Sequence, residues 1–372
     1  MNVISFQAFP NVRDYQLNTA ITRYDPEIHI SVLAEVSDYS KLFEVLGHPF
    51  VASPRFLRSK PANLFGRLWY HFFDEKFSGL RLARIAKEMS ADLIHSHNFN
   101  RLGYYAIRYT DLPVIHDVSD FYSIFPRSQS DNPSTGPSLW ARYKHRKELR
   151  WEQFVFEHAA ALTFQSPFYI DIAKSRYNLP ADIVMIPNGV LRDDLPQKSL
   201  PKLSQKDGRV HTVFVGHINR LKFERVKGIA DKGIPVHLYT FQSAEFNAVL
   251  LAECRAHEYL YHHGTLPRRE LLLALTQYDF GLVLWYRGAT EPFFDAVLPS
   301  KMFYYLASGL PVIVAPYRSL SAFVQSRGCG FVLNNIDELE EKIHQRYSIG
   351  DISEYTVEHY IPELIALYRK LV

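Results

Sequence analysis

The sequence predicts an α/β protein made of two doubly wound domains, and three observations support this. The chain has 372 residues, which is long for one hydrophobic core. Short β-rich runs alternate with helical patterns, as is typical of parallel sheets. The alternation then restarts after Pro187-Asn188-Gly189. We therefore expect domains at residues 1–187 and 188–350 whose sheets face each other across a cleft. A C-terminal helix at 351–372 is expected to pack back toward the first domain.

The first half is expected to hold five strands and two long helices. Each strand is a short apolar run rich in β-branched or aromatic residues, and each helix shows apolar residues at helical spacing. The second helix is highly charged. The predicted strands are Val3–Phe9, Ile28–Ala34, Leu93–His97, Pro113–Asp117 and Ala161–Gln165, and the helices are Arg67–Met89 and Leu139–His158.

The second half repeats the same alternation after a polar stretch, Leu191–Gly208, which we interpret as the connecting region. A last helix, Ser353–Leu371, is expected to follow the second sheet. The predicted strands are His211–Val215, Val236–Phe241, Tyr259–His263, Phe280–Leu284, Val312–Ala315 and Gly330–Leu333; the helices are Phe223–Lys232, Ala244–Ala256, Arg268–Gln277, Lys301–Ser308 and Ile336–Tyr347.

Composition limits the class of protein. The net charge of +3 is too small to make nucleic acid the main partner. The two cysteines, Cys254 and Cys329, fit a reducing compartment and no disulfide framework. The N-terminus lacks the features of a signal peptide, and no apolar run is long enough to span a bilayer. We expect a cytoplasmic protein, with peripheral contact to the inner face of the cytoplasmic membrane left open.

The most informative segment is Asp295–Pro316. Pro299 sits well just before a helix, and Ser300 is a good N-cap residue. Free backbone amides at residues 300–302, the positive end of the helix dipole and the Lys301 cation would together suit a diphosphate. Gly309 is expected to end the helix in the left-handed conformation. The alternative is an ordinary strand–loop–helix–strand unit with a surface lysine.

Several ordered motifs resemble those of glycosyltransferase family 4 (glycosyltransferases group 1). The resemblance covers most of the chain and is strongest from about Ala161 to Pro316. It implies a GT-B fold and a nucleotide-sugar donor. The motifs are Asp92-Leu93-Ile94-His95-Ser96-His97, Ile186-Pro187-Asn188-Gly189-Val190, Val215-Gly216-His217-Ile218, Tyr261-His262-His263-Gly264-Thr265-Leu266-Pro267 and Pro299-Ser300-Lys301 with Ala307-Ser308-Gly309-Leu310-Pro311.

The resemblance assigns donor-binding roles. Gly216 would let the phosphates approach the backbone, and Lys301 would neutralise the leaving diphosphate together with a basic residue after Gly216. Which one is left open among Arg220, Lys222 and Lys227, because the family has an arginine here and a lysine-glycine pair later. Thr265 and Leu266 would border the nucleobase through their main chains. For all these cations the alternative is a solvated surface position.

The chain departs from the family at its acidic pair. The position of the glutamate that contacts the ribose is Tyr304, and the position of the first glutamate is Val297. Tyr304 is kept among the donor-binding residues, and Glu291 and Asp295 are candidates for the first glutamate's task. This leaves the stereochemical outcome open. An inverting glucuronosyltransferase-like enzyme of the same fold is therefore an alternative.

In the first half, His116 and Asp117 stand at the carboxyl end of a predicted strand, where a site belongs. They resemble the family loop whose histidine contacts the donor sugar. His116 would orient a sugar hydroxyl, and Asp117 or Asp120 would act as general base. Alternatively, an aspartate caps the next helix and His116 only packs. No metal is expected, because the chain has no His/Cys cluster with ligand spacing.

A basic and aromatic stretch at Arg55–Lys87 suits an anionic membrane surface. The family's first domain commonly meets lipid-linked acceptors at this place. The alternative is a helix with a solvated cationic face and a buried aromatic face. The candidate acceptor or membrane residues are Arg58, Arg67, Trp69 and Arg81.

These inferences predict a glycosyltransferase of hexosyltransferase type. It would move a sugar from a UDP- or GDP-linked donor to a hydroxyl of a glycan or lipid-linked acceptor, with retention and without a cofactor. Cell-surface polysaccharide or glycoconjugate synthesis is the expected context. The rival functions are a nucleotide-sugar epimerase or hydrolase on the same fold and a non-catalytic, membrane-docked relative.

Overall fold

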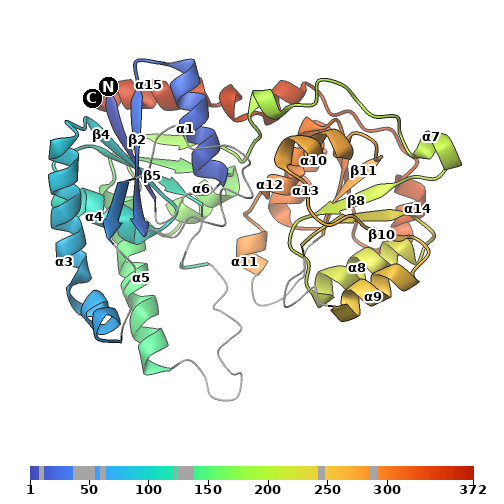
Figure 1. Cartoon of the computed structure of the whole chain (residues 1–372), viewed down its shortest axis with the longest axis horizontal. Helices are drawn as coiled ribbons and strands as arrows, with labels where there is room; N and C mark the ends of the chain where they lie inside the picture. The colour runs from blue at the N-terminus through green and yellow to red at the C-terminus, as the bar shows by residue number, and fades with distance from the viewer. Residues whose placement is uncertain are drawn as a thin grey trace. The chain divides into compact units, whose positions relative to one another are not determined.

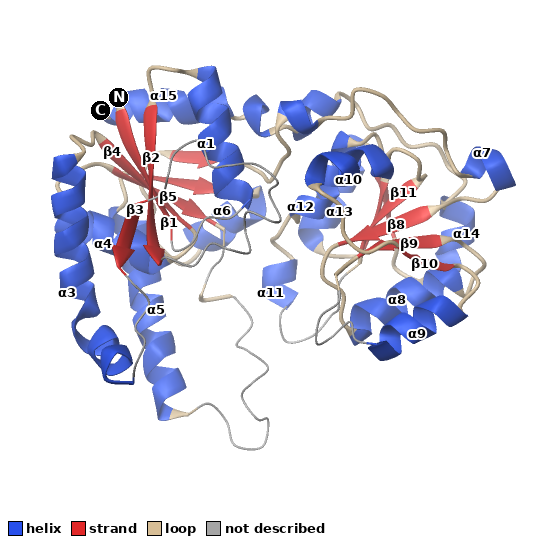
Figure 2. Cartoon of the chain, viewed as in Figure 1, coloured by secondary structure: helices blue, strands red, loops and turns tan. Residues whose placement is uncertain are grey.

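A computed structural model describes residues 1–7, 12–36, 55–58, 64–119, 122–124, 138–241, 248–284 and 291–372. Within these ranges, side chains are described except at 35–36, 55–58, 64–75, 140 and 291–292. The chain divides into two compact units. One comprises residues 1–187 together with 360–372, and the other comprises residues 188–359. In each unit a sheet lies between helices, as Figures 1 and 2 show.

The first unit is built on a seven-stranded parallel sheet in the order β3-β2-β1-β4-β5-β6-β7. The strands are β1 (Asn2–Gln7), β2 (His29–Val36), β3 (Arg55–Arg58), β4 (Leu93–His97), β5 (Val114–Val118), β6 (Ala161–Phe164) and β7 (Ile183–Met185). The helices are α1 (Val12–Tyr24), α3 (Leu64–Glu88), α4 (Asn100–Tyr109), α5 (Leu139–His158), α6 (Pro167–Lys174) and, from the C-terminus, α15 (Ile361–Leu371).

The second unit has a six-stranded parallel sheet in the order β10-β9-β8-β11-β12-β13. The strands are β8 (Thr212–Val215), β9 (Val236–Tyr239), β10 (Leu260–His262), β11 (Phe280–Val283), β12 (Val312–Val314) and β13 (Gly330–Val332). The helices are α7 (Ser204–Asp207), α8 (Arg220–Ala230), α9 (Ala248–Ala256), α10 (Arg268–Leu275), α11 (Glu291–Phe294), α12 (Ser300–Ala307), α13 (Arg318–Arg327) and α14 (Leu339–Lys342).

The prediction of two doubly wound parallel sheets is confirmed, and every predicted strand is present with small shifts at its described ends. The predicted end of the first strand, Phe9, lies outside the described residues. Two helix predictions are wrong in length. The segment expected as Ile336–Tyr347 forms only a 3-10 turn, Ile336–Glu338, and the short α14. The segment expected as Ser353–Leu371 forms two 3-10 turns before α15, which starts beside Pro362. Proline in a first helical turn is tolerated, but it would interrupt a longer helix.

The stretch Leu191–Gly208 was interpreted from the sequence as the connecting region. The structure places it inside the second unit, so that interpretation is wrong. Its Asp194 side chain is buried and forms ion pairs with Arg268 and Arg269 of α10, at 2.7 Å and 3.0 Å. The polar composition of this stretch therefore reflects a buried ion pair as well as surface residues.

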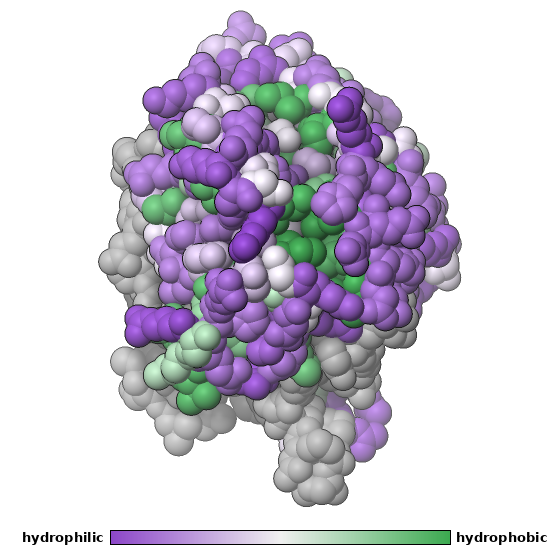
Figure 3. All heavy atoms as spheres, turned by 90° about the vertical axis from the view of Figure 1, so that its right-hand side faces the viewer, coloured by the Kyte–Doolittle hydropathy of each residue, from purple (hydrophilic) through white to green (hydrophobic). Residues whose placement is uncertain are grey.

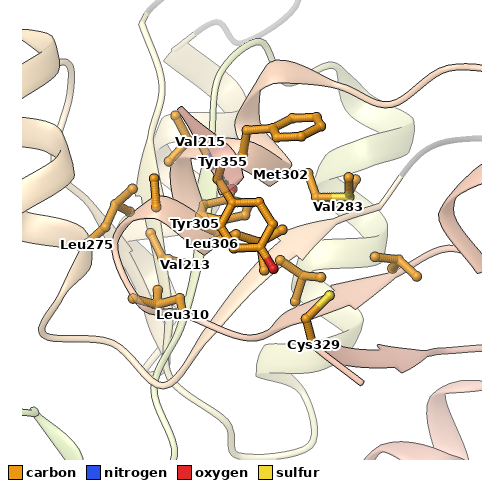
Figure 4. Close-up of a cluster of buried hydrophobic side chains, with 14 of the residues drawn as sticks. Val213, Val215, Leu275, Val283, Met302, Tyr305, Leu306, Leu310, Cys329 and Tyr355 are labelled. Atoms are coloured by element: carbon orange, nitrogen blue, oxygen red, sulfur yellow. Dashed lines mark hydrogen bonds between the residues drawn. The ribbon is translucent and has the colours of Figure 1, made fainter. Parts of the chain in front are cut away.

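The strand order of each sheet reverses at one place, between β1 and β4 in the first unit and between β8 and β11 in the second. Ligands of open α/β sheets bind beyond the carboxyl ends of the strands at such a point. In the second unit, a cluster of buried apolar side chains surrounds Tyr305, as Figure 4 shows. A Cβ atom on Gly281 of β11 would lie 2.2 Å from the Tyr305 ring, so only glycine leaves room for it.

Candidate functional site

The candidate site of the second unit begins where β8 ends. Gly216 follows the strand with φ +102, a left-handed value that favours glycine. A Cβ atom placed there would lie 3.7 Å from Nζ of Lys301. The backbone at the end of β8 and the lysine of α12 therefore face each other at the switch point of the second sheet.

The Lys301 ammonium occupies an unusual environment. Its Nζ lies 3.9 Å from the centroid of the buried Phe214 ring. No described residue accepts a hydrogen bond from it or forms an ion pair with it. Burial, together with the smaller effect of the positive charge of Lys222, lowers the pKa of Lys301 to about 7. The site thus holds a lysine with no anionic partner among the described residues.

The start of α12 differs in detail from the sequence prediction. Pro299, and not Ser300, is the N-cap residue, and Ser300 is the first helical residue. The amide of Met302 donates to the Pro299 carbonyl at 3.0 Å, so it is not a free donor as expected. The amides of Ser300 and Lys301 have no acceptor in the described part of the chain. The helix thus offers two free amides beside the ammonium group, and Ser300 is exposed.

Two hydrogen bonds hold the surroundings of this helix start. Asn188 donates from Nδ2 to the Leu298 carbonyl at 2.9 Å, and the Tyr305 hydroxyl accepts from the Val215 amide at 2.8 Å. At the other end, Gly309 has φ +74, which confirms the predicted left-handed helix end. The loop before α12 and the end of β8 are therefore held by buried hydrogen bonds.

The structure separates the three basic residues that the sequence left as alternatives. Arg220 is exposed and forms ion pairs with Glu224 and Glu253. Lys227 pairs with Asp231 at 2.9 Å. Lys222 is half-buried and near enough to Lys301 to influence its pKa. Only Lys222 of the three therefore shares the environment of Lys301.

The loop after β10 carries the predicted nucleobase contacts. Gly264 has φ +75, which turns the chain out of the strand. Thr265 and Leu266 follow it and are both exposed. That they border a base stays a prediction.

Tyr304 lies where a family member would have the ribose-binding glutamate. Its ring is half-buried, and the charges of Arg268 and Asp194 both influence its pKa, which burial raises. The sequence does not reveal this buried ion pair, because its partners lie far apart in the chain, one in the stretch Leu191–Gly208 and the other in α10. Tyr304 brings a phenol, and no carboxylate, to this position.

Glu291 and Asp295 were predicted to replace the first glutamate of the family's acidic pair, and only the Asp295 side chain is described. Asp295 accepts a hydrogen bond from the Arg318 amide at 3.1 Å through Oδ1, and its carbonyl accepts from Ser319 at 3.0 Å. The Asp295 carboxylate thus binds the first amide of α13, and its role at the donor sugar stays a prediction. Glu291 opens α11, and its side chain lies outside the described residues.

In the first unit, the structure assigns Asp117 a role other than general base. Arg13 of α1 donates to both of its carboxylate oxygens, at 2.9 Å and 2.8 Å, and Thr163 donates at 2.6 Å. Asp117 is fully buried, yet the Arg13 guanidinium holds the pKa of this carboxyl far below its usual range. A carboxylate bound in this way is a poor proton acceptor, which corrects the prediction. Asp120 lies outside the described residues.

His116 is also placed differently from the prediction. Its ring is fully buried, with Nδ1 2.9 Å from the Ser96 hydroxyl and Nε2 3.1 Å from Oδ1 of Asn100. Burial lowers its pKa to about 4. The structure therefore supports the alternative that His116 packs in the core, and it offers no nitrogen to a sugar in the described arrangement.

A buried polar cluster that the sequence did not reveal surrounds Asp117. Asp14, His97 and Asp117 bring one ligand atom each to within 4.8 Å of one another. Two neighbours make this set a poor cation site. Arg13 already neutralises Asp117, and Ser5 accepts hydrogen bonds from Gln7 and Asn18, so its own proton points to Nε2 of His97. His97 then carries its proton on Nδ1, the atom that would have to bind a metal.

The predicted acceptor residues are described only in part. The backbones of Arg58, Arg67 and Trp69 lie in β3 and α3, and their side chains lie outside the described residues. Arg81 of α3 is exposed, and Phe77 and Leu80 beside it are 60% and 53% exposed. Within the described ranges, no helix is both long and apolar enough to cross a bilayer. On the face drawn in Figure 3, hydrophilic residues predominate.

Comparison with known proteins gives two family matches. Residues 28–193 match the family described as Glycosyltransferase Family 4, and residues 213–355 match Glucosyltransferase 3-like, C-terminal domain. Glucosyltransferase 3 of Streptococcus gordonii is 38% identical over 78 residues. That alignment covers 20% of this chain and 23% of the relative, so the chain aligns with less than a quarter of that protein's length.

Solved structures share the fold over the whole chain. Sucrose-phosphate synthase from Thermosynechococcus elongatus has a TM-score of 0.66 at 14% identity, and the match covers 100% of this chain and 99% of that one. UDP-GlcNAc 2-epimerase from Methanocaldococcus jannaschii has a TM-score of 0.58 at 10% identity, covering 98% and 100%. The S. aureus MnaA–UDP complex has a TM-score of 0.57 at 13% identity, covering 100% and 97%. These identities support the fold alone.

Proposed function

From the place of this chain among the GT-B proteins of the glycosyltransferase family 4-like group, we propose that it transfers a sugar from a nucleoside diphosphate sugar to a hydroxyl group. The donor is UDP- or GDP-linked, the sugar is a hexose, and the acceptor is a glycan or a lipid-linked glycan. Synthesis of a cell-surface polysaccharide or glycoconjugate is the proposed setting.

The observation that carries this proposal is the Lys301 ammonium beside Gly216. It lies at the carboxyl end of β8 with no anionic partner among the described residues, next to two free amides of α12. A diphosphate would supply the missing negative charge and accept from those amides. The same groups would stabilise the diphosphate as it leaves the sugar. No metal is part of this proposal, because fixed positive groups serve that purpose.

Retention of configuration is the proposed outcome. An inverting transfer needs a general base that takes the acceptor's proton directly. Asp117 is bound to Arg13 and Thr163, and His116 is bound in the core, so neither described candidate is suited to that task. The anomeric configuration of the product, followed by NMR, tests this point, and an inverted product would contradict it.

Transfer from a panel of UDP- and GDP-sugars to glycan and lipid-linked acceptors tests the function. Replacement of Lys301 by alanine is expected to weaken donor binding roughly 10- to 100-fold, because it removes a charged partner of the phosphates. Lys227→Ala, at a surface lysine paired with Asp231, is the matched control. Equal donor affinity of Lys301→Ala and the control would contradict the phosphate assignment.

The same experiment separates the rival functions. An epimerase or hydrolase would convert the donor without any acceptor, and a non-catalytic relative would bind it without conversion. Incubation of each donor alone therefore accompanies the transfer assay. Turnover that needs no acceptor would replace the transferase proposal with one of the rivals.

The exposed part of α3 suits contact with an anionic membrane surface. Phe77 and Leu80 expose apolar area, and Arg81 is exposed beside them. Such a surface binds a leaflet through apolar insertion and charge together. Sedimentation with vesicles that contain or lack anionic lipid tests this contact. Equal, weak binding to both vesicle types would argue against it.

A further inference from the structure

We propose that the diphosphate subsite beside Gly216 is proton-coupled, and that the Lys301 side chain takes up a proton from solvent when a nucleoside diphosphate binds. The inference rests on the proposed function, since it concerns the same subsite. The groups around Nζ determine the protonation change that accompanies binding.

The surroundings of Nζ remove part of its hydration, because Lys301 is half-buried, and they supply no acceptor in exchange among the described residues. The atom lies over the Phe214 ring and beside the backbone of Gly216. No described residue accepts a hydrogen bond from it. An ammonium group is strongly hydrated, and an aromatic face compensates only part of the lost hydration. The unliganded subsite therefore favours the neutral amine more than water does.

The charges that face Nζ act in the same direction. From α8, Lys222 contributes a like charge, and it is the charged group whose effect on Lys301 is resolved. From α12, the free amides of Ser300 and Lys301 and the positive end of the helix dipole add partial positive charge. β8 contributes only an aromatic ring and backbone. Consistent with this, the pKa of Lys301 is lowered to about 7.

A bound diphosphate reverses this balance. It brings negative charge against Nζ and accepts hydrogen bonds that only the ammonium form can donate fully, so the pKa of Lys301 rises on binding. At pH 8 the unliganded amine is then largely neutral and the liganded one charged. One proton moves from buffer to the Nζ lone pair, and no other bond changes. Near pH 6 the lysine is already charged, so uptake falls.

Calorimetric titration with UDP, and separately with GDP, measures this uptake. At pH 8, the binding enthalpy is measured in buffers of different ionisation enthalpy, such as HEPES, tricine and Tris. The slope of the observed binding enthalpy against the buffer's ionisation enthalpy equals the number of protons taken up. We expect a slope approaching one proton for the unaltered protein at pH 8 and a much smaller one at pH 6. Lys227→Gln, which changes a lysine paired with Asp231, is expected to keep the slope.

Two variants locate the proton. Lys301→Arg keeps a positive charge that does not titrate in this range, so its slope is expected to fall to near zero at pH 8. Lys222→Gln removes the like charge, so Lys301 is more fully protonated beforehand and the slope is expected to decrease. Circular dichroism and thermal unfolding verify that each variant is folded.

The outcomes distinguish the two proposals. If neither UDP nor GDP binds at any pH, the nucleotide-sugar function itself is wrong. If either binds without proton uptake at pH 8, the function stands and the proton coupling is overturned. Uptake that persists unchanged in Lys301→Arg also overturns it, because the proton then goes to the nucleotide or to another residue.

Discussion

At the scale of residues, Arg13 is expected to contribute strongly to the stability of the first unit. Its guanidinium binds the buried Asp117 and the carbonyls of Ile186 and Pro187. Arg13→Ala would leave a buried carboxylate without its counter-charge, so we expect a loss of about 3–5 kcal/mol in the free energy of unfolding. Urea unfolding measures it. Arg84→Ala, in an exposed pair with Glu88, is the control, and equal midpoints for both variants would refute the prediction.

Gly281 is expected to affect the stability of the second unit, because of steric fit and not because of charge. An alanine Cβ there would overlap the Tyr305 ring, so Gly281→Ala is expected to destabilise the second unit by about 1–3 kcal/mol. Gly228→Ala is the matched control, because nothing lies within 4 Å of the added atom and alanine favours the helix. Thermal unfolding compares the two variants. A stable Gly281→Ala would show that Tyr305 moves aside at no cost.

At the scale of elements, α15 makes a buried polar contact to the first sheet in addition to its apolar packing. The Tyr368 hydroxyl lies 2.6 Å from Nδ1 of His95, and both residues are buried. Tyr368→Phe leaves that nitrogen without its partner, so we expect a loss of about 1–3 kcal/mol and faster hydrogen exchange in α15. Arg369→Ala, at an arginine that is itself largely exposed, is the comparison. Unchanged exchange in Tyr368→Phe would mean that apolar packing alone holds the helix.

At the scale of the whole molecule, buried histidines predict sensitivity to acid. Burial lowers the pKa of His95 and His116 to about 4 and that of His237 to about 3. Their pKa in the unfolded chain is about 6.5, so between these values unfolding takes up protons. The stability that these neutral histidines contribute is therefore complete above about pH 6.5 and is lost as pH falls toward 4.

Urea unfolding at a series of pH values tests this behaviour. Each such histidine contributes a slope of about 1.4 kcal/mol per pH unit near pH 5. His237→Asn is expected to reduce the slope, since His237 lies in a ladder with His211 and His263, at 2.9 Å on each side. Stability that does not change between pH 7 and pH 5 would contradict the prediction.

Helices and strands could be predicted where their hydrophobic pattern is complete within one short segment. Val312–Val314 is apolar throughout, and Leu139–His158 repeats at helical spacing, so both follow from the sequence. Helix α1 was not predicted, because polar residues such as Asp14, Gln16 and Asn18 are buried on it and obscure the apolar period. Short β7 and β3 were missed because three or four residues carry too little periodicity.

The sequence by itself determined the two parallel sheets and the helix end at Gly309. These depend on neighbouring residues and on backbone preferences that a short segment carries with it. Only the tertiary structure decided which polar groups meet. It placed Arg13 on Asp117 and His116 in the core, and it left Lys301 over Phe214 without an acceptor among the described residues. Those pairings join segments far apart in the chain, and burial, which sets the charge state of each group, exists only after the chain has folded.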